Sequence, residues 1–111
     1  MTESWSIMIP AWNAEDLLGE TLESVLAASA DLDTVHIEVV DDASTDGTAD
    51  VARRFAPNVG YWRQPENVGA IANFNTCLER AIGKIVHIVH ADDLVEPLLK
   101  LDLLTKVCVF L

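Results

Sequence analysis

Residues 35–48 read VHIEVVDDASTDGT, and this stretch decides the fold of the 111-residue chain. Its first six residues are rich in β-branched side chains and predict a buried strand. The strand runs straight into Asp41 and Asp42, and the polar loop that follows contains helix-capping residues and a glycine. A helix is therefore expected over residues 48–56. A strand, an acidic loop and a helix in this order form the repeating unit of an α/β fold.

The same alternation extends to both sides of this stretch. Expected strands cover residues 5–9, 35–40, 59–63 and 84–89, and expected helices cover residues 14–29, 48–56 and 70–82. Asn13 is expected to cap the first helix, and Ile71 and Ile82 belong to the apolar period of the third. Because the strands are almost continuously apolar, we predict a three-layer α/β/α domain over residues 1–111. Its mainly parallel, Rossmann-like sheet has four strands in the order 3-2-1-4.

The charge of the chain excludes one large class of partners. Lys and Arg number 7 and Asp and Glu number 18, which gives a formal net charge of -11. The first 50 residues contain 12 acidic residues and no Lys or Arg. A nucleic-acid-binding surface needs clustered Lys and Arg to displace the counterions of the phosphates. We therefore expect no nucleic acid partner, and an acidic half that is either solvated or binds a divalent cation.

The cysteines and the apolar segments indicate the compartment. Cys77 and Cys108 are 31 residues apart, which matches no metal-ligand spacing, and both have apolar neighbours, as reduced core thiols do. The N-terminus has no basic segment of a signal peptide. No window reaches the roughly 18 uninterrupted apolar residues of a membrane helix. The sequence predicts a cytoplasmic protein that is not transmembrane.

Polar residues gather where the expected strands end. Ligands of parallel α/β sheets bind beyond the carboxyl ends of the strands, which here are residues 10–13, 41–46, 64–69 and 90–93. The first of these loops, PAWN, lacks the glycines of a dinucleotide-binding turn and of a phosphate-binding P-loop. A bound nucleotide would therefore need another group to neutralise its diphosphate.

A divalent metal held by carboxylates can supply that charge. Asp92 and Asp93 are adjacent, follow a buried strand and share the sheet edge with Asp41 and Asp42. Their hard oxygen ligands suit Mg²⁺ or Mn²⁺ better than zinc. From the residues alone, an alternative stays open: these acidic residues only cap the helices that follow them.

Three segments, in this order, carry a resemblance to a known family. They are SIMIPAWNAEDLLGETLESVL at 6–26, IEVVDDASTDGTADVARRF at 37–55 and ENVGAIANFNTCLERAIGKIVHIVHADD at 66–93. The chain resembles the N-terminal half of a family 2 glycosyltransferase with the GT-A fold. DDASTDGT, then NVG, then ADD at these spacings is a specific pattern.

The resemblance implies a site that binds a nucleotide-diphosphate sugar. It implies that the turn formed by Pro10, Ala11, Trp12 and Asn13 lines the base together with Asp42, whose carboxylate accepts a hydrogen bond from the ring N–H, while Asp41 faces its own loop. Ser44, Asp46, Gly47 and Thr48 match positions that shape this loop. The nucleotide-sugar-binding positions implied further along the chain are Asn67, Gly69, Asn75 and Asp92.

The resemblance also implies that Asp93, with Asp92, binds Mn²⁺ or Mg²⁺ on the diphosphate. The implied reaction is transfer of the sugar to an acceptor hydroxyl, with inversion of configuration. The chain departs from the family pattern at His90, where many members have an Asp, and at Cys77, where a Gly is frequent. The acceptor-binding half and its catalytic general base are expected beyond residue 111, so no catalytic residue is assigned and the chain is interpreted as truncated.

The end of the chain has an unusual composition. Residues 97–111 are expected to form a C-terminal helix, and ten of the last fourteen residues are apolar. Such a helix cannot place all its apolar side chains on one inward face. We therefore expect a homo-oligomer built on this segment.

Two other functions compete with sugar transfer. The chain could be a non-catalytic module that binds nucleotide or associates with itself without turnover. A phospho-acceptor signalling domain also places an acidic pair after a strand, but it needs a lone Asp after the third strand. The third expected strand here ends in Arg63 and Gln64.

Overall fold

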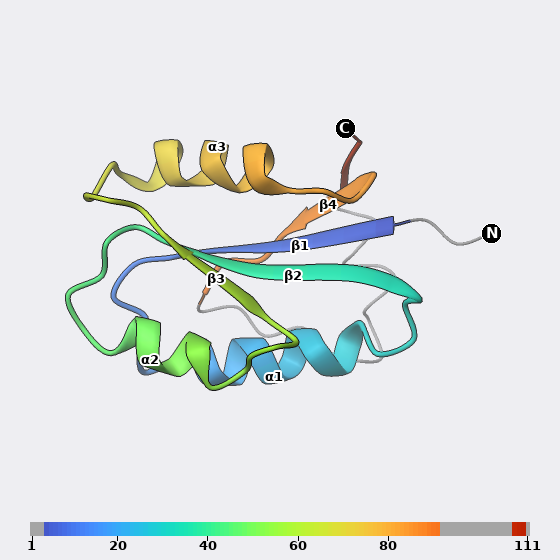
Figure 1. The fold of residues 1–111 in the computed structure, drawn as a ribbon, viewed down its shortest axis with the longest axis horizontal. Coiled ribbons are helices and arrows are strands. Elements are labelled where there is room, and N and C mark those ends of the chain that lie inside the picture. The colour runs from blue at the N-terminus through green and yellow to red at the C-terminus, as the bar shows by residue number, and fades with distance from the viewer. Residues whose placement is uncertain (1–3, 92–107, 111) are drawn as a thin grey trace.

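The computed structural model describes residues 4–91 together with the backbone of residues 108–110. Its elements are β1 Ser4–Ala11, α1 Leu18–Ala28, β2 Thr34–Asp41, α2 Thr48–Arg53, β3 Gly60–Arg63, α3 Ala70–Arg80, β4 Ile85–Ile88 and β5 Cys108–Phe110. Helix α3 lies on one face of the sheet, and α1 and α2 lie on the other (Figure 1). The three-layer α/β/α architecture is therefore confirmed.

The sheet has the order β3-β2-β1-β4-β5. Strand β1 is central and pairs in parallel with β2 over its whole length, from Ser4↔Thr34 to Ala11↔Asp41. On its other side β1 pairs in parallel with β4, and β3 pairs in parallel with β2. The order 3-2-1-4 predicted for the four parallel strands is confirmed, and it brings the carboxyl ends of β1, β2 and β4 to one edge (Figure 1).

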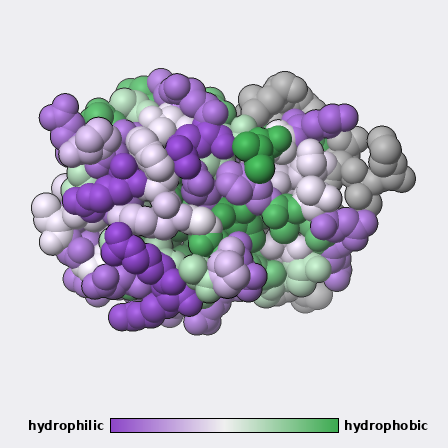
Figure 2. All heavy atoms as spheres, viewed as in Figure 1, coloured by the Kyte–Doolittle hydropathy of each residue, from purple (hydrophilic) through white to green (hydrophobic). Residues whose placement is uncertain are grey.

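Two apolar clusters fix the helices to the sheet because side chains alternate between the faces of a strand. Ile7 and Ile9 of β1 face α1 and α2, where Leu18 and Leu22 complete the larger cluster. Met8 belongs to the smaller cluster on the α3 face, which also contains Val40, Cys77, Val86 and Ile88. On the outer surface, Figure 2 shows hydrophilic side chains over the end of the molecule that carries α2.

The first strand and the first helix differ from the prediction. Strand β1 continues through Pro10 to Ala11. No residue of β4 is paired opposite Pro10, so its missing N–H removes no hydrogen bond to that strand. Helix α1 begins at Leu18 instead of residue 14, and Asn13 does not cap it. Asn13 has a left-handed backbone with φ 47°, and its side chain accepts a hydrogen bond from the Thr45 N–H.

Helix α3 ends two residues before the predicted boundary. Ala81 leaves the helical conformation, and the N–H groups of Ile82 and Gly83 both donate to Oγ of Ser6 in β1, at 3.0 and 2.7 Å. These bonds draw the chain off the helix and onto the sheet. Ile82 and Ile71 are about four-fifths exposed, so neither contributes to the core. The buried residues of α3 are Asn73 and Cys77.

The end of the chain also corrects a prediction. Residues 108–110 form strand β5, which pairs antiparallel with β4 from Ile85↔Phe110 to His87↔Cys108. The predicted helix over 97–111 is therefore wrong for these three residues. Val109 and Phe110 favour strands, and β4 offers them the hydrogen-bonding groups of an open sheet edge. The rest of the predicted helix lies outside the described residues.

Candidate functional site

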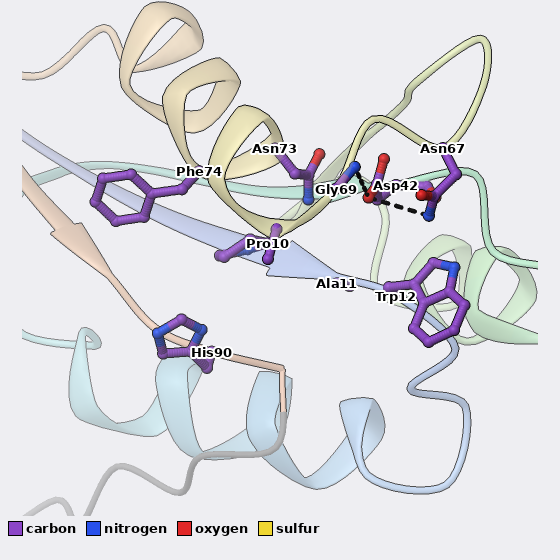
Figure 3. A pocket seen from close by; sticks show the side chains of 10 residues that line it. Pro10, Ala11, Trp12, Asp42, Asn67, Gly69, Asn73, Phe74 and His90 are labelled. Atoms are coloured by element: carbon purple, nitrogen blue, oxygen red, sulfur yellow. Dashed lines mark hydrogen bonds between the residues drawn. The ribbon is translucent and has the colours of Figure 1, made fainter.

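A pocket of about 290 Å³ opens at the carboxyl edge of the sheet, between the end of β1 and the start of α3 (Figure 3). Its lining residues are Pro10, Ala11, Trp12, Asp42, Asn67, Gly69, Ala70, Asn73, Phe74 and His90. Six of these were predicted as nucleotide-sugar-binding residues. The lining residues in this part of the chain include no Lys or Arg, so no cationic side chain from the described residues neutralises an anionic ligand there.

Asp42 is the acidic residue of the pocket, and its carboxylate is held in place by the chain itself. Oδ1 accepts a hydrogen bond of 2.8 Å from the Val68 N–H. Oδ2 accepts bonds from the Gly69 N–H and from Nδ2 of Asn67, at 3.0 and 3.1 Å (Figure 3). A carboxylate offers about four lone-pair sites. The described donors fill three of them, which leaves one acceptor site on Oδ1.

Two features of the 67–69 segment permit this arrangement. Gly69 has φ +93°, a left-handed conformation that strains any residue with a Cβ, and it turns the Gly69 N–H toward Asp42. Asn67 places both hydrogens of its side-chain amide on Asp42, one on Oδ2 and one on the backbone oxygen. Asn67 therefore positions Asp42 and has no donor left for a ligand.

Asp41 has a different environment, although it is adjacent in sequence. Its carboxylate is fully buried and accepts hydrogen bonds from Ser44, from the Tyr61 hydroxyl at 2.6 Å and from Nη1 of Arg63 at 3.3 Å. Desolvation and the bond to Asp41 raise the pKa of Tyr61. Asp41 joins its own loop to β3 and is not among the lining residues of the pocket, as the resemblance implied.

The loop after β1 and the loop after β2 are joined by a series of side-chain to backbone hydrogen bonds. The N–H groups of Asn13, Ala14 and Glu15 donate to Ser44, Thr48 and Asp46, and in return Thr45 and Gly47 donate to Asn13 and Glu15. Desolvation acts to raise the pKa of Asp46, but hydrogen bonds from Thr48 and from the Glu15 N–H hold it below its usual range. These hydrogen bonds fix the two loops to each other, but none of the residues that they join lines the main pocket.

Asn75 does not lie where the resemblance placed it. It is exposed on α3 and does not line the pocket, whereas Asn73 is 2% exposed and does. The two residues differ by about 200° around a helix, so only one of them can face the sheet. The signal for Asn73 was its spacing to Cys77: residues four apart share a helix face, and Cys77 was expected to be buried.

Past β4, the chain leads from the pocket toward the predicted metal ligands. His90 is exposed and lines both the main pocket and a second hollow of about 310 Å³. The second hollow is lined by Pro10, Trp12, Asn13, Ala14, Leu17, His90 and Ala91. The Ala91 carbonyl accepts a 2.6 Å hydrogen bond from Oγ1 of Thr21. Asp92 and Asp93, which follow directly, lie outside the described residues.

The described residues contain neither a metal-binding cluster nor a membrane span. Within them, no group of three or more His, Cys, Asp or Glu side chains is placed to hold a metal ion. None of the described helices combines the length and the hydropathy that crossing a bilayer requires.

The fold agrees with that of solved glycosyltransferases. Staphylococcus aureus TarS, residues 1–349, in complex with UDP-GlcNAc has a TM-score of 0.79 and 27% identity, over 89% of this chain and 29% of that one. The mannosyltransferase PcManGT of Pyrobaculum calidifontis, in complex with GDP-Man and Mn²⁺, has a TM-score of 0.76 and 31% identity, over 85% and 29%. The class is therefore the GT-A glycosyltransferase fold.

The sequence comparison identifies the family. Residues 6–108 match the family described as Glycosyl transferase family 2, and the chain belongs to it. A Bacillus subtilis glycosyltransferase, TuaG, whose name assigns it to teichuronic acid biosynthesis, is 38% identical over 95 residues, which cover 79% of this chain and 35% of the relative. The chain spans about a third of the length of the relatives that it matches.

Proposed function

We propose that this chain is the donor-binding part of an enzyme that transfers a sugar from a nucleotide-diphosphate sugar to an acceptor hydroxyl. The observation that carries the proposal is the Asp42 carboxylate at the pocket. Three donors hold it, and one acceptor site on Oδ1 is left for the ring N–H of a base. Solved relatives bound to UDP-GlcNAc and to GDP-Man support a nucleotide sugar as the ligand.

In this proposal, the base lies in the main pocket between apolar and polar walls. Pro10, Ala11 and Trp12 supply one wall, and Trp12, which is 59% exposed, offers an aromatic surface. Asn67 and Gly69 act mainly by holding Asp42 in position. Asn13 lines the second hollow and joins the two loops. We propose that Asn73, rather than Asn75, is the α3 residue that contacts the nucleotide sugar.

We further propose that Asp93, with Asp92, holds Mn²⁺ or Mg²⁺. Carboxylate oxygens are the ligands that these ions prefer, and a GDP-Man complex of one solved relative contains Mn²⁺. A divalent cation bound by these carboxylates suits the pocket, because the described lining residues include no Lys or Arg that could neutralise a diphosphate. A divalent ion supplies the positive charge that stabilises a departing diphosphate. Thr21 fixes the Ala91 carbonyl just before this acidic pair.

Further parts of the proposal concern the rest of the enzyme. Transfer is proposed to invert the configuration of the sugar, with a carboxylate beyond residue 111 removing the proton of the acceptor hydroxyl. We place the protein in the cytoplasm, where a buried free thiol such as Cys77 stays reduced. Association into homo-oligomers through residues 98–111 is proposed from their apolar composition, and sedimentation of the chain at tens of micromolar tests it. Sedimentation as a monomer would contradict it.

Titration of the chain with UDP, GDP and dTDP, each in Mn²⁺ and in EDTA, tests the main proposal. Asp42→Asn should weaken binding about 10- to 100-fold, because its amide N–H₂ takes the place of Oδ1, where it opposes one donor and the ring N–H, or of Oδ2, where it opposes two donors. Asp93→Ala should remove the benefit of Mn²⁺ and leave the fold intact. Asp50→Asn is the matched control, because the Asp50 side chain is 77% exposed. Equal affinity in Mn²⁺ and EDTA would contradict the metal site, and full affinity of Asp42→Asn would contradict the base contact.

A non-catalytic nucleotide-binding module is the second candidate. It needs only the pocket and the Asp42 contact, and no general base is assigned among the described residues. The same titration separates the two functions when a turnover assay accompanies it. Release of nucleotide diphosphate from a bound nucleotide sugar, in the presence of an acceptor hydroxyl, identifies an enzyme. Tight binding without release identifies the module.

A further inference from the structure

Asn73 is a buried polar side chain in the first turn of α3, beside the base site of the proposed function. It is 2% exposed and lines the main pocket together with Asp42, which is 3% exposed. Figure 3 shows both side chains on the wall formed by α3 and the end of β2. A polar group this deeply buried needs hydrogen-bond partners.

The orientation of the Asn73 amide follows from its neighbours. Nε2 of Gln64 donates both of its hydrogens, one to Oδ1 of Asn73 at 3.1 Å and one to Oγ1 of Thr76 at 2.9 Å. The atom of Asn73 that faces Gln64 must therefore be the oxygen. Nδ2 of Asn73 donates to the Val40 carbonyl at 3.0 Å. A flipped amide would place two donors against each other and two acceptors against each other.

This orientation leaves one hydrogen of Asn73 without a partner. Nδ2 carries two hydrogens, and the described residues accept one of them, at Val40. Asn67, the other amide of the pocket, has given both of its hydrogens to Asp42. Besides the indole of Trp12 and the ring of His90, the pocket therefore presents a buried side-chain donor on Asn73 and a carboxylate acceptor site on Asp42. A ligand that satisfies both removes the cost of an unpaired buried N–H.

We infer that Asn73 selects nucleotides whose base carries an imide edge, by donating a hydrogen bond to the carbonyl oxygen beside the ring N–H. The inference rests on the proposed function, in which Asp42 accepts that ring N–H. In uracil and thymine a carbonyl flanks the N–H on each side, so a carbonyl meets Asn73 in either orientation of the ring. Guanine has one such carbonyl and fits in one orientation.

The same contacts reject the other two bases. The ring nitrogens of cytosine and adenine that lie on this edge carry no hydrogen at neutral pH. They would oppose the Asp42 carboxylate with a lone pair, unless the ring moved to bring its exocyclic amine there. A site built from hydrogen-bonding groups discriminates strongly against a ligand that leaves those groups unpaired. The expected order of affinity is UDP and dTDP first, then GDP, with CDP and ADP last.

Base analogues test the inference on the unaltered chain in Mn²⁺. N3-methyl-UDP removes the ring N–H, and 4-thio-UDP and 2-thio-UDP replace one carbonyl oxygen with sulfur, a poor acceptor. We expect weak binding of N3-methyl-UDP and a loss of about 5- to 50-fold for one of the two thio analogues. If N3-methyl-UDP binds as UDP does, both the proposed Asp42 contact and the inference fail. If N3-methyl-UDP binds weakly but both thio analogues bind as UDP does, the inference alone fails.

A pair of variants provides a second test of the inference. Asn73→Asp replaces the donor with an acceptor, so the affinity ratio of UDP to CDP should fall at least tenfold. Asn58→Asp makes the same chemical change at an exposed position away from the pocket and should leave the ratio unchanged. A purely structural role of Asn73 predicts equal losses for both nucleotides, and that result would overturn the inference. If thermal melting shows that Asn73→Asp does not fold, the analogue series decides.

Discussion

Oγ1 of Thr21 donates a hydrogen bond of 2.6 Å to the carbonyl oxygen of Ala91, across 70 positions of sequence. Thr21 is fully buried in α1, and Ala91 is the last described residue before Asp92. The same hydroxyl also lies 3.2 Å from the Leu17 carbonyl of its own helix. Through this bond the first helix of the domain fixes the chain that enters the proposed metal-binding pair.

Thr21→Val should separate this hydrogen bond from the packing around it, because valine has nearly the same shape. The buried Ala91 carbonyl loses its side-chain donor, so we expect unfolding to require about 1–2 kcal/mol less free energy. The gain in UDP affinity that Mn²⁺ provides should also shrink. Urea titration and nucleotide titration measure the two effects. Thr34→Val, at an exposed position, is the control, and equal Mn²⁺ dependence in both variants would refute the link to the metal site.

Gly83→Ala tests the close approach of the α3–β4 turn to β1. A Cβ at Gly83 would lie 2.5 Å from the Trp5 carbonyl carbon and 2.7 Å from the Ser6 nitrogen, both of which are backbone atoms that cannot move aside. The substitution should cost about 3 kcal/mol or more in unfolding free energy. Gly19→Ala is the matched control. Its Cβ would make an ordinary 3.8 Å contact in α1, so it should raise stability by about 0.5 kcal/mol.

The strands were predictable because each is a continuous run of β-branched and apolar residues, which favours a buried strand. VHIEVV lies within β2. Because successive side chains of a strand point to opposite faces, the sequence also indicates which side chains face each layer of helices. The start of α1 was not predictable from capping preference alone. Asn13 is a good cap in isolation, but its side chain is used by a loop 32 residues away. A hydrogen bond between residues so far apart cannot be predicted from the sequence around either of them.

In the candidate site, too, some residues were predictable from local sequence and others depend on how distant segments pack. The family pattern located Asp42, Asn67 and Gly69, because their roles depend on residue type at fixed spacing. Helix α3 begins at Ala70 as predicted, but its buried face differs from the prediction: Ile71 and Ile82 of the apolar period are exposed, whereas the polar Asn73 is buried because Gln64 and the Val40 carbonyl supply its hydrogen bonds. The strand at 108–110 depends on the free edge of β4, which only the assembled sheet reveals.

Cys77 should be chemically inert in the folded protein. Burial raises the pKa of its thiol to about 12, with a smaller contribution from the charge of Glu38. At pH 8 the folded thiol is therefore almost entirely protonated, and the thiolate is the reactive form. In a Cys108→Ser background, iodoacetamide should modify Cys77 only at the rate of unfolding. Rapid modification under native conditions would show that the thiol is accessible and ionised.

The raised thiol pKa also predicts a loss of stability at high pH. The folded state keeps the thiol protonated, so the contribution of Cys77 is complete below its unfolded pKa of about 8.5 and is lost as pH rises toward 12. The midpoint of urea unfolding should fall over this range. Cys77→Ala should show a smaller fall, although it is less stable at pH 7 because it leaves a small cavity.

Buried His87 should make the fold less stable at low pH, in contrast to Cys77. Burial lowers the pKa of this β4 side chain, and its Nδ1 has no hydrogen-bond partner among the residues that the structure describes. A group with a depressed folded pKa stabilises the fold above its unfolded pKa of about 6.5, and this contribution is lost as pH falls further. His87→Leu should therefore lose less stability than the parent chain between pH 7.5 and pH 5. His90→Leu, at an exposed histidine, should retain the parent behaviour.

The two outermost strands of the sheet are short: β3 has four residues and β5 has three. An exposed strand edge is a template on which another polypeptide can add a strand, and long flat edges are where amyloid-like stacking begins. Here the long strands β1 and β2 are enclosed, and Arg63 at the end of β3 adds a charge beside Asp41. The domain therefore offers little backbone for edge-to-edge aggregation at high protein concentration.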